Sequence, residues 1–409
     1  MQGPGRGLSS LLIRVAVAAA ALTVAFGAAP ALAAKGPELP ARSWLLVDVR
    51  DGTTLAAEAP KQRAPVASAT KLMTAYAARR DLPLSKRVVA PPYEALAAES
   101  LVGLRAAERI AVRDLLYGLL LASGNDAAVA LAEAAAGSEP RFVAQMNRDA
   151  KRLGLRNTSY ANPIGLDEPG NYSSARDLVT LATELREDPF FRRVLDTPEA
   201  TLRTDGRTIR VTNRNLLVRT VPWVNGVKTG YTLGADYVLV GSGTRKGVTL
   251  VSAVLGAPTE SERDAATLEL LEYGFSQYRR ERLIKPGERL AAPEVRYQDT
   301  TMPLVAGREL TTTLRRDQRV KTDLRVPAEV EGPIERGDRI GSATVTVDGQ
   351  AIGTVPLLAA RTVGEADIGD RVDSAIPGGR LAAWVLITAA LVGAVLLFGW
   401  AISRRRGTR

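Results

Sequence analysis

The sequence contains no histidine and no cysteine. A Ser-His-Asp triad, a thiolate nucleophile and zinc sites built on imidazole or sulfur ligands are therefore excluded. A hydrolase of this composition that uses no metal has only lysine, the carboxylates and tyrosine as bases. The 54 Lys and Arg residues comprise nine lysines and 45 arginines. Because arginine stays protonated whereas a buried lysine can lose its proton, the few lysines are the candidates for a base.

The net charge is strongly positive, +10 over 409 residues. The positive residues are scattered along the chain and form no basic stripe interleaved with aromatic residues, so the pattern does not favour a nucleic-acid partner. A charge of this sign favours a polyanionic surface. The length is sufficient for two domains with separate hydrophobic cores.

The N-terminal residues 1–34 have the pattern of a signal peptide. Arg6 and Arg14 precede an apolar run over residues 15–26, and small residues in the sequence APALAA follow it. This order predicts cleavage after Ala33 and export of the chain, with an uncleaved N-terminal anchor as the alternative.

The C-terminal region contains 22 residues without a charge, residues 381–402. This stretch is long enough to cross a hydrocarbon core of about 30 Å. A tryptophan lies near each end, and three arginines follow at 404–406. We therefore expect a single-pass transmembrane helix in the cell membrane, with residues 403–409 as a cytoplasmic tail and residues 35–380 outside the membrane.

Residues 38–280 are predicted to form the first globular body. The sequence SWLLVDVRDGTTLAAEA indicates a hairpin that turns at residues 51–52, and DYVLVGSGTRKGVTLVSAVLG indicates another that turns near residues 245–247. Helical patterns such as VRDLLYGLLLAS and NDAAVALAEAAA lie between them, and a further helix is expected over about 258–280. Hairpins at both ends predict one antiparallel sheet with helices packed on it, an α/β (α+β) fold.

The second body, residues 284–365, has a different pattern. The sequence SATVTVDGQAIGTVPLLAA alternates around a turn at Asp348 and Gly349, and glycine and proline interrupt the rest. We expect a small all-β sandwich here, followed by a linker at residues 366–380.

The sequence VASATKLMTAY, residues 66–76, places Ser68 and Lys71 three residues apart at a predicted helix start. Residues with this spacing share a helix face, and the helix N-terminus offers backbone N–H groups to an oxyanion. The pair has the arrangement of a serine nucleophile and a lysine base. A capped helix with a solvated lysine is the alternative, because Ser-x-x-Lys alone is a weak signal.

Two more motifs favour the catalytic interpretation. Ser123-Gly-Asn125 lies in the turn between two predicted helices, and Lys228-Thr-Gly230 enters a predicted strand. Ser-x-x-Lys, Ser-x-Asn and Lys-Thr-Gly in this order are the signature of serine penicillin-recognising enzymes.

Longer segments extend the likeness: RDLLYGLLLASGNDAAVALAE, NPIGLDEPGNYSSARDL, TNRNLL and WVNGVKTGYT resemble D-alanyl-D-alanine carboxypeptidases, the low-molecular-mass penicillin-binding proteins. The resemblance covers about residues 40–360 and includes the β-rich second body. It implies a penicillin-binding/β-lactamase-like catalytic domain that acts on peptidoglycan stem peptides and is inhibited by β-lactams. No cofactor or metal is expected.

The resemblance assigns Ser68 the attack on the carbonyl of the penultimate D-alanine, which forms an acyl-enzyme. Lys71 would accept the serine proton, and its amine must be neutral for this step. Burial and a second cation, Lys228, would both lower its pKa. Ser123 would pass a proton toward the leaving amine, and Asn125 would bind both Lys71 and the substrate amide.

The remaining residues of the implied site bind substrate. Lys228 and the Thr229 hydroxyl would hold the terminal carboxylate, and Gly230 would let the strand approach closely. The backbone N–H of Tyr231 would join that of Ser68 in an oxyanion hole.

Arg214, in TNRNLL, matches an arginine that helps to hold the carboxylate end. Two features depart from the family pattern. Asp236 stands where the family often has glycine, which leaves the local packing open, and a full membrane span replaces the common amphipathic C-terminal helix.

Two alternative functions use the same fold. A class A β-lactamase deacylates through a glutamate, typically in a Glu-x-x-x-Asn loop, and the sequence contains no such pattern. A penicillin adduct should then be long-lived. A catalytically inactive wall-binding scaffold is the other alternative, and the intact motifs argue against it. Capture of the acyl group by an amine, transpeptidation, stays open.

Overall fold

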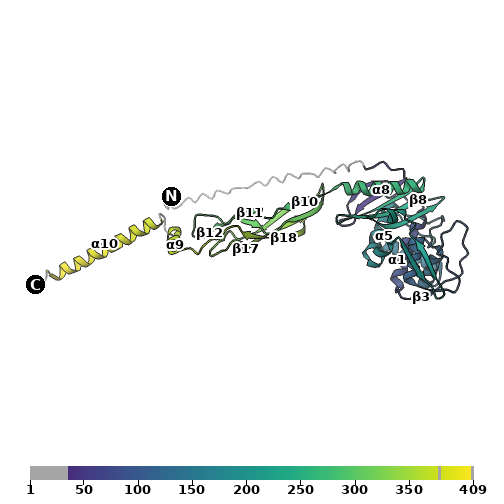
Figure 1. Cartoon of the computed structure of the whole chain (residues 1–409), viewed down its shortest axis with the longest axis horizontal. Coiled ribbons are helices and arrows are strands. Elements are labelled where there is room, and N and C mark those ends of the chain that lie inside the picture. Colours follow the sequence, from purple (N-terminus) through teal and green to yellow (C-terminus); the bar gives the residue numbers. More distant parts are fainter. Residues whose placement is uncertain (1–35, 376–378, 407–409) are drawn as a thin grey trace, which may run out of the picture. The chain divides into compact units, whose positions relative to one another are not determined.

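The computed structural model describes residues 36–375 and 379–406 (Figure 1). The predicted signal peptide at residues 1–34 lies outside the described residues. The first body contains a five-stranded antiparallel sheet in the order β2-β1-β9-β8-β7. Its strands are β1 Ser43–Asp48, β2 Thr54–Glu58, β7 Val224–Thr232, β8 Asp236–Arg245 and β9 Val248–Ala257.

The helices of this body and two short ribbons lie between β2 and β10. The helices are the 3-10 helix η1 Ala67–Thr70, α1 Lys71–Asp81, α2 Val112–Tyr117, the π-helical turn η2 Gly118–Ala122, α3 Asn125–Ala136, α4 Glu139–Arg152, α5 Ala175–Glu187, α6 Pro189–Leu195, α7 Leu216–Thr220 and α8 Glu260–Ser276. The ribbons pair β3 Arg87–Val89 with β4 Arg109–Ala111, and β5 Glu199–Arg203 with β6 Thr208–Thr212.

The sheet is covered by helices on both faces. Figure 1 shows α8 along one face and α5 with α1 on the other. Because side chains alternate along a strand, Leu46 of β1 packs toward α8, whereas its neighbours Leu45 and Val47 pack in the larger core with the other helices. Both predicted hairpins are present and are joined in one sheet by the pairing of β1 with β9. The predicted antiparallel sheet with packed helices is confirmed.

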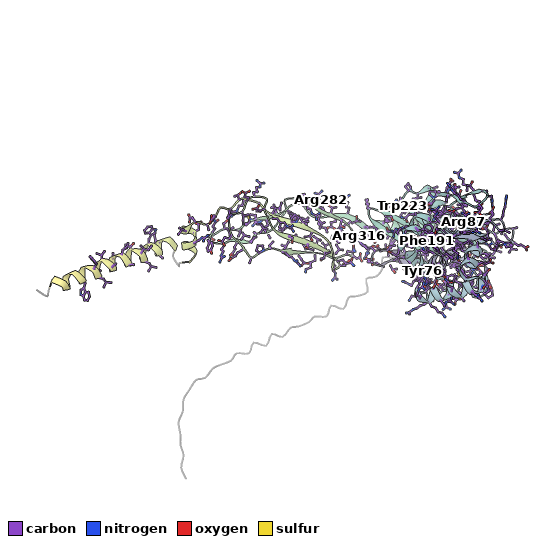
Figure 2. The ribbon with its side chains drawn as sticks, turned by 90° about the horizontal axis from the view of Figure 1, so that it is seen from below. Tyr76, Arg87, Phe191, Trp223, Arg282 and Arg316 are labelled. Carbon is purple, nitrogen blue, oxygen red and sulfur yellow. The ribbon has the colours of Figure 1, made fainter. Side chains whose placement is uncertain are left out.

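The α8 face carries an aromatic contact at its edge. Trp223, labelled in Figure 2, meets Phe275 of α8 edge-on at 5.4 Å between ring centroids, and the Arg245 guanidinium lies 3.9 Å from the Trp223 ring centroid.

The predicted helix over 258–280 is too long, because α8 ends at Ser276 and Tyr278 begins the strand β10.

The second body is β-rich. Its five-stranded sheet has the order β11-β13-β18-β17-β15, and the turn at Asp348 and Gly349 joins β17 to β18 as predicted. Two-stranded sheets pair β10 with β14 and β12 with β16, so the predicted sandwich of two packed sheets is not confirmed. The strands are β10 Tyr278–Ile284, β11 Arg289–Ala291, β12 Glu294–Val295, β13 Leu304–Ala306, β14 Leu310–Arg315, β15 Val320–Arg325, β16 Glu329–Val330, β17 Arg339–Val347 and β18 Gln350–Ala359.

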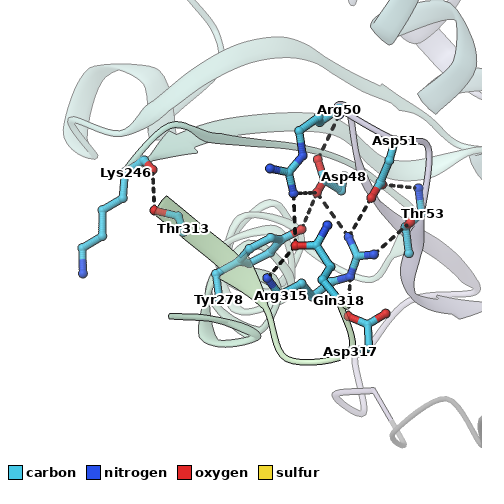
Figure 3. Close-up of polar contacts among 10 residues, drawn as sticks. All are labelled: Asp48, Arg50, Asp51, Thr53, Lys246, Tyr278, Thr313, Arg315, Asp317 and Gln318. Atoms are coloured by element: carbon cyan, nitrogen blue, oxygen red, sulfur yellow. Dashed lines mark hydrogen bonds and ion pairs between the residues drawn. The ribbon is translucent and has the colours of Figure 1, made fainter. Parts of the chain in front are cut away.

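The β10–β14 ribbon is bonded to the β1–β2 hairpin (Figure 3). Arg315 is 8% exposed and donates to the carboxylates of Asp48, 1% exposed, and Asp51. The Tyr278 hydroxyl donates to Asp48 at 2.6 Å, and Thr313 donates to the backbone oxygen of Lys246 at 3.1 Å. A buried carboxylate on β1 is therefore neutralised by an arginine from the ribbon.

The C-terminal segment contains two helices, α9 Ile368–Ala375 and α10 Gly379–Arg406. The predicted linker at 366–380 is thus partly helical. Among the residues whose side chains the structure describes, no helix is long and apolar enough to cross a membrane. The predicted span at residues 381–402 lies within α10, of which residues 379–380, 383 and 401–406 have no described side chain. The span is not confirmed.

Candidate active site

The nucleophile and base candidates lie where a 3-10 helix passes into an α-helix. Ser68 is in η1, and Lys71 is the first residue of α1. The Lys71 Nζ is 3.0 Å from the Ser68 Oγ, which is hydrogen-bonding distance. Ser68 is half-buried and Lys71 is fully buried. The structure therefore brings together the two side chains that the sequence pairs.

The Lys71 amine occupies an enclosed polar site. Its Nζ donates to the backbone oxygen of Ile164 at 2.5 Å, which positions the amine beside Ser68. Burial lowers the pKa of Lys71 to about 7, and the positive charge of Arg214 acts in the same direction, whereas the carboxylates of Glu99 and Asp126 oppose it. A lysine with this pKa is substantially neutral at neutral pH and can accept a proton.

The second motif faces Lys228. The Lys228 Nζ donates to the Ser123 Oγ at 3.0 Å and to the backbone oxygen of Thr229 at 2.9 Å. Burial lowers the pKa of Lys228 well below its ordinary range, and repulsion by Lys71 adds to the effect. Ser123 is held at φ 64°, in the left-handed region, after the π-helical turn η2. This unusual backbone aims the hydroxyl at the third motif.

Asn125 begins α3, where the sequence predicted a turn between helices. Its Nδ2 donates to the Oε2 of Glu99 at 2.7 Å. Among the described residues, the two hydrogen bonds of the Lys71 Nζ go to Ser68 and Ile164, so the predicted bond from Lys71 to Asn125 is not present.

Two glycines permit the close approaches that assemble the site. A Cβ at Gly230 would lie 3.1 Å from the Ser68 backbone nitrogen and 3.0 Å from the Ala67 Cβ, a tight contact that β7 and η1 avoid because the residue is glycine. A Cβ at Gly165, where φ is +90°, would lie 2.1 Å from the Ala67 oxygen. These distances are consistent with the role expected of Gly230, and Gly165 is a further glycine that the sequence analysis did not single out.

The other predicted binding residues surround this centre. Thr229 is buried on β7, next to Lys228, and Tyr231 is 51% exposed and stacks on Tyr237 with 4.4 Å between ring centroids. Arg214 is exposed, and its charge lowers the pKa of both active-site lysines. A cation at this position also suits a bound carboxylate.

The structure explains how Asp236 can stand where the family often has glycine, in the turn after the third motif. It adopts φ 53°, a conformation that favours glycine and that aspartate tolerates better than most residues. Its carboxylate forms an ion pair with Arg42 at 3.2 Å, and Arg42 also donates to the backbone oxygen of Ala235 at 2.6 Å. Aspartate therefore replaces glycine here with a compensating contact.

The sequence analysis did not find three residues that approach the motif segments from other parts of the chain, namely Ile164, Glu99 and Gly165. Ile164 contributes only a backbone oxygen, so its side chain gives no signal. Glu99 lies in an irregular segment between β3 and β4 without a recognisable motif. Gly165 was detectable only as part of the longer likeness NPIGLDEPGNYSSARDL.

Comparisons with known proteins show which family the chain belongs to. The family model described as D-alanyl-D-alanine carboxypeptidase matches residues 30–259, and the model described as penicillin-binding protein 5, C-terminal domain, matches residues 278–365. The chain belongs to the D-alanyl-D-alanine carboxypeptidase family. It is a serine D-Ala-D-Ala carboxypeptidase of the penicillin-binding protein 5 type, with a peptidoglycan peptide as substrate.

Named relatives of this carboxypeptidase match over most of their length. The D-alanyl-D-alanine carboxypeptidase DacF of Bacillus subtilis is 33% identical over 78% of this chain and 85% of its own length. DacA of Escherichia coli is 33% identical over 80% of this chain and 85% of its own.

Two solved structures have a similar fold. Penicillin binding protein 5 from Haemophilus influenzae is 30% identical, with a TM-score of 0.57 over 81% of this chain and all of the other. The Streptomyces K15 DD-transpeptidase is 31% identical, with a TM-score of 0.57 over 59% of this chain and all of the other. The family that the three motifs predicted, the D-alanyl-D-alanine carboxypeptidases, is therefore confirmed.

Proposed function

We propose that Ser68 is the nucleophile of this carboxypeptidase and that Lys71 is its base. The observation that carries this assignment is the 3.0 Å distance between the Ser68 Oγ and a buried Lys71 Nζ whose pKa is about 7. As the Ser68 Oγ bonds to the carbonyl carbon of the penultimate D-alanine, its proton passes to Lys71. The C–N bond to the terminal D-alanine then breaks, and water later releases the acyl group.

The departing D-alanine amine needs a proton. Ser123 is suited to deliver it, because its hydroxyl accepts a hydrogen bond from the Lys228 Nζ at 3.0 Å and so keeps its own proton to donate. The backbone N–H groups of Ser68 and Tyr231 would stabilise the oxyanion, which the close approach allowed by Gly230 supports.

The terminal carboxylate of the substrate is assigned to Lys228, Thr229 and Arg214. Two cations and a hydroxyl at one end of the site offer charge-assisted hydrogen bonds to a carboxylate. A carboxylate bound there would also raise the pKa of Lys228, whose unpaired charge is disfavoured by burial. Asn125 is assigned to the substrate amide.

A membrane anchor at residues 381–402 is part of the proposal, with a catalytic body at 38–280 held outside the membrane and a β-rich body at 284–365 as spacer. Large apolar side chains of α10 are exposed on successive positions, among them Trp384 at 68% and Val385 at 62%, and again Leu397 at 68% and Phe398 at 70%. Successive residues point to different sides of a helix, so α10 is apolar on all sides and needs an apolar environment.

Release of D-alanine from a stem pentapeptide tests the assignment. The full chain should release D-alanine, and Ser68→Ala should not. A scaffold function would be favoured if the wild-type chain released none under any condition. Rapid turnover of a fluorescent penicillin by the wild-type chain would favour the β-lactamase alternative.

Transfer of the acyl group to an amine is a second candidate reaction. The likeness to the Streptomyces K15 DD-transpeptidase, at 31% identity, favours it. The same assay with an added amino acid separates the two reactions, because transfer yields a new peptide product whereas hydrolysis yields the shortened peptide.

A further inference from the structure

Glu99 is the acceptor for three donors beside the second motif. Its Oε2 accepts from the Asn125 Nδ2 at 2.7 Å and also from the Tyr93 hydroxyl, and its Oε1 accepts from the backbone N–H of Leu96 at 3.1 Å. Hydrogen bonds from Asn125 and Tyr93 outweigh partial burial and lower the pKa of Glu99, so this carboxylate stays ionised and can only accept hydrogen bonds.

The segment that directly follows Glu99 is attached to the start of α3. The Asn125 backbone N–H donates to the Ser100 oxygen at 2.8 Å. The neighbouring Asp126 carboxylate accepts from the backbone N–H groups of residues 102, 103 and 104 at 2.9, 2.8 and 2.9 Å. Glu99 is therefore held at a fixed position relative to Asn125.

We propose that Glu99 is a positioning residue for acylation, which fixes the orientation of the Asn125 amide toward the substrate. The inference rests on the proposed function, in which Asn125 binds the substrate amide. An asparagine amide has a donor end and an acceptor end that occupy nearly the same shape. An ionised carboxylate accepts only the donor end, so Glu99 holds the Asn125 nitrogen on its side and leaves the oxygen and the second N–H for other partners.

Tyr93 helps Glu99 to hold the Asn125 amide in one orientation. Its hydroxyl uses its single proton on the same Glu99 oxygen that accepts from Asn125. Glu99 therefore receives two side-chain donors on one oxygen, and rotation of the carboxylate away from Asn125 would break both bonds. Charge-assisted hydrogen bonds of this kind are about twice as strong as neutral ones.

Glu99 also acts on the base through its charge. The charged groups that face Lys71 are the carboxylates of Glu99 and Asp126, which favour its ammonium form, and Arg214, which disfavours it. Lys228 also lies close enough to Lys71 for the two charges to repel each other. Loss of the Glu99 charge would therefore leave Lys71 neutral at lower pH.

A role as the base for deacylation does not suit Glu99. Its three hydrogen bonds and lowered pKa make it a weak proton acceptor. A long-lived penicillin adduct is consistent with this arrangement.

The test compares Glu99→Gln and Glu99→Ala with the same substitutions at Glu94, an exposed glutamate on the same segment. The acylation rate constant of the full chain in detergent is measured with benzylpenicillin from pH 5.5 to 9. The side-chain carbonyl that Glu99→Gln introduces still accepts from Asn125 and Tyr93, so this variant should keep the rate at high pH within about threefold and move its acid limb to lower pH by roughly half a unit or more. Glu99→Ala should move the limb equally and lower the high-pH rate by about 10-fold or more.

The outcomes distinguish the inference from the proposed function. If the wild-type chain is not acylated at all, the proposed function fails. If it is acylated and both Glu99 variants behave as their Glu94 counterparts, Glu99 is not a positioning residue and the proposed function stands. An equal loss of rate in Glu99→Gln and Glu99→Ala without any movement of the acid limb would indicate a structural role and would also overturn the inference.

Discussion

The Ser68 Oγ and the Lys71 Nζ lie 3.0 Å apart across the boundary between η1 and α1. This contact joins the nucleophile to a base whose amine is buried and bonded to the Ile164 oxygen. Because the amine has lost its contact with water, its pKa falls from the ordinary range of a lysine to about 7.

The acylation rate should therefore depend on pH around 7. Protonated Lys71 cannot accept the serine proton, so below pH 7 the rate should fall about tenfold for each pH unit, and above it the rate should approach a plateau. Stopped-flow measurement of benzylpenicillin acylation from pH 5.5 to 9 checks this. An acid limb centred near pH 10 would mean that Lys71 has an ordinary pKa and is not the base.

Gly165→Ala should destabilise the protein and lower the acylation rate. The new Cβ would lie 2.1 Å from the Ala67 oxygen, so the backbone before Ser68 must move. Gly170→Ala is the matched control, because Gly170 has φ +89°, close to the +90° of Gly165, with nothing within 4 Å of its Cβ position.

Both glycine variants incur the left-handed strain of about 1 kcal/mol, and only Gly165→Ala adds a clash of roughly 1–3 kcal/mol. Urea unfolding and the acylation rate measure the two effects. Equal behaviour of the two variants would show that the approach of Gly165 to Ala67 does not hold the site.

The contact between β14 and β1 should be important for stability but not for catalysis. Arg315→Met leaves the buried Asp48 carboxylate with only the longer ion pair to Arg50, at 3.6 Å, and the loss of its donor should cost about 1–3 kcal/mol. The control is Arg282→Met; Arg282 lies on β10 of the same ribbon and is labelled in Figure 2. This variant removes only an exposed ion pair with Glu309 and should cost about 0.5 kcal/mol or less. Urea unfolding of the full chain measures both, and a similar small cost for the two would contradict the buried-pair account.

Much of the fold could be predicted from local pattern. Turns such as that at Asp348 and Gly349 carry strong hairpin signals, and the alternating strands beside them define which residues are buried. The end of α8 was predicted wrongly because Tyr278 continues the apolar spacing of the helix although it belongs to a strand, where its hydroxyl binds Asp48. Only the tertiary contact distinguishes the two.

The site was predictable where the motifs carry their own chemistry. Ser68, Lys71 and Ser123 were recognised from residue type and order. Glu99 and the Ile164 oxygen could not be, because they reach the motifs from separate loops and the chemistry of one is in the backbone. Residue order cannot show which loop will lie over a helix start.

The intact mass of the full chain after exposure to benzylpenicillin tests the central claim most directly. We predict one added benzylpenicilloyl group that persists through purification and maps to Ser68, and none on Ser68→Ala. A wild-type chain that carries no adduct, or an adduct that maps to another residue, would contradict the assignment of Ser68 and Lys71 as nucleophile and base.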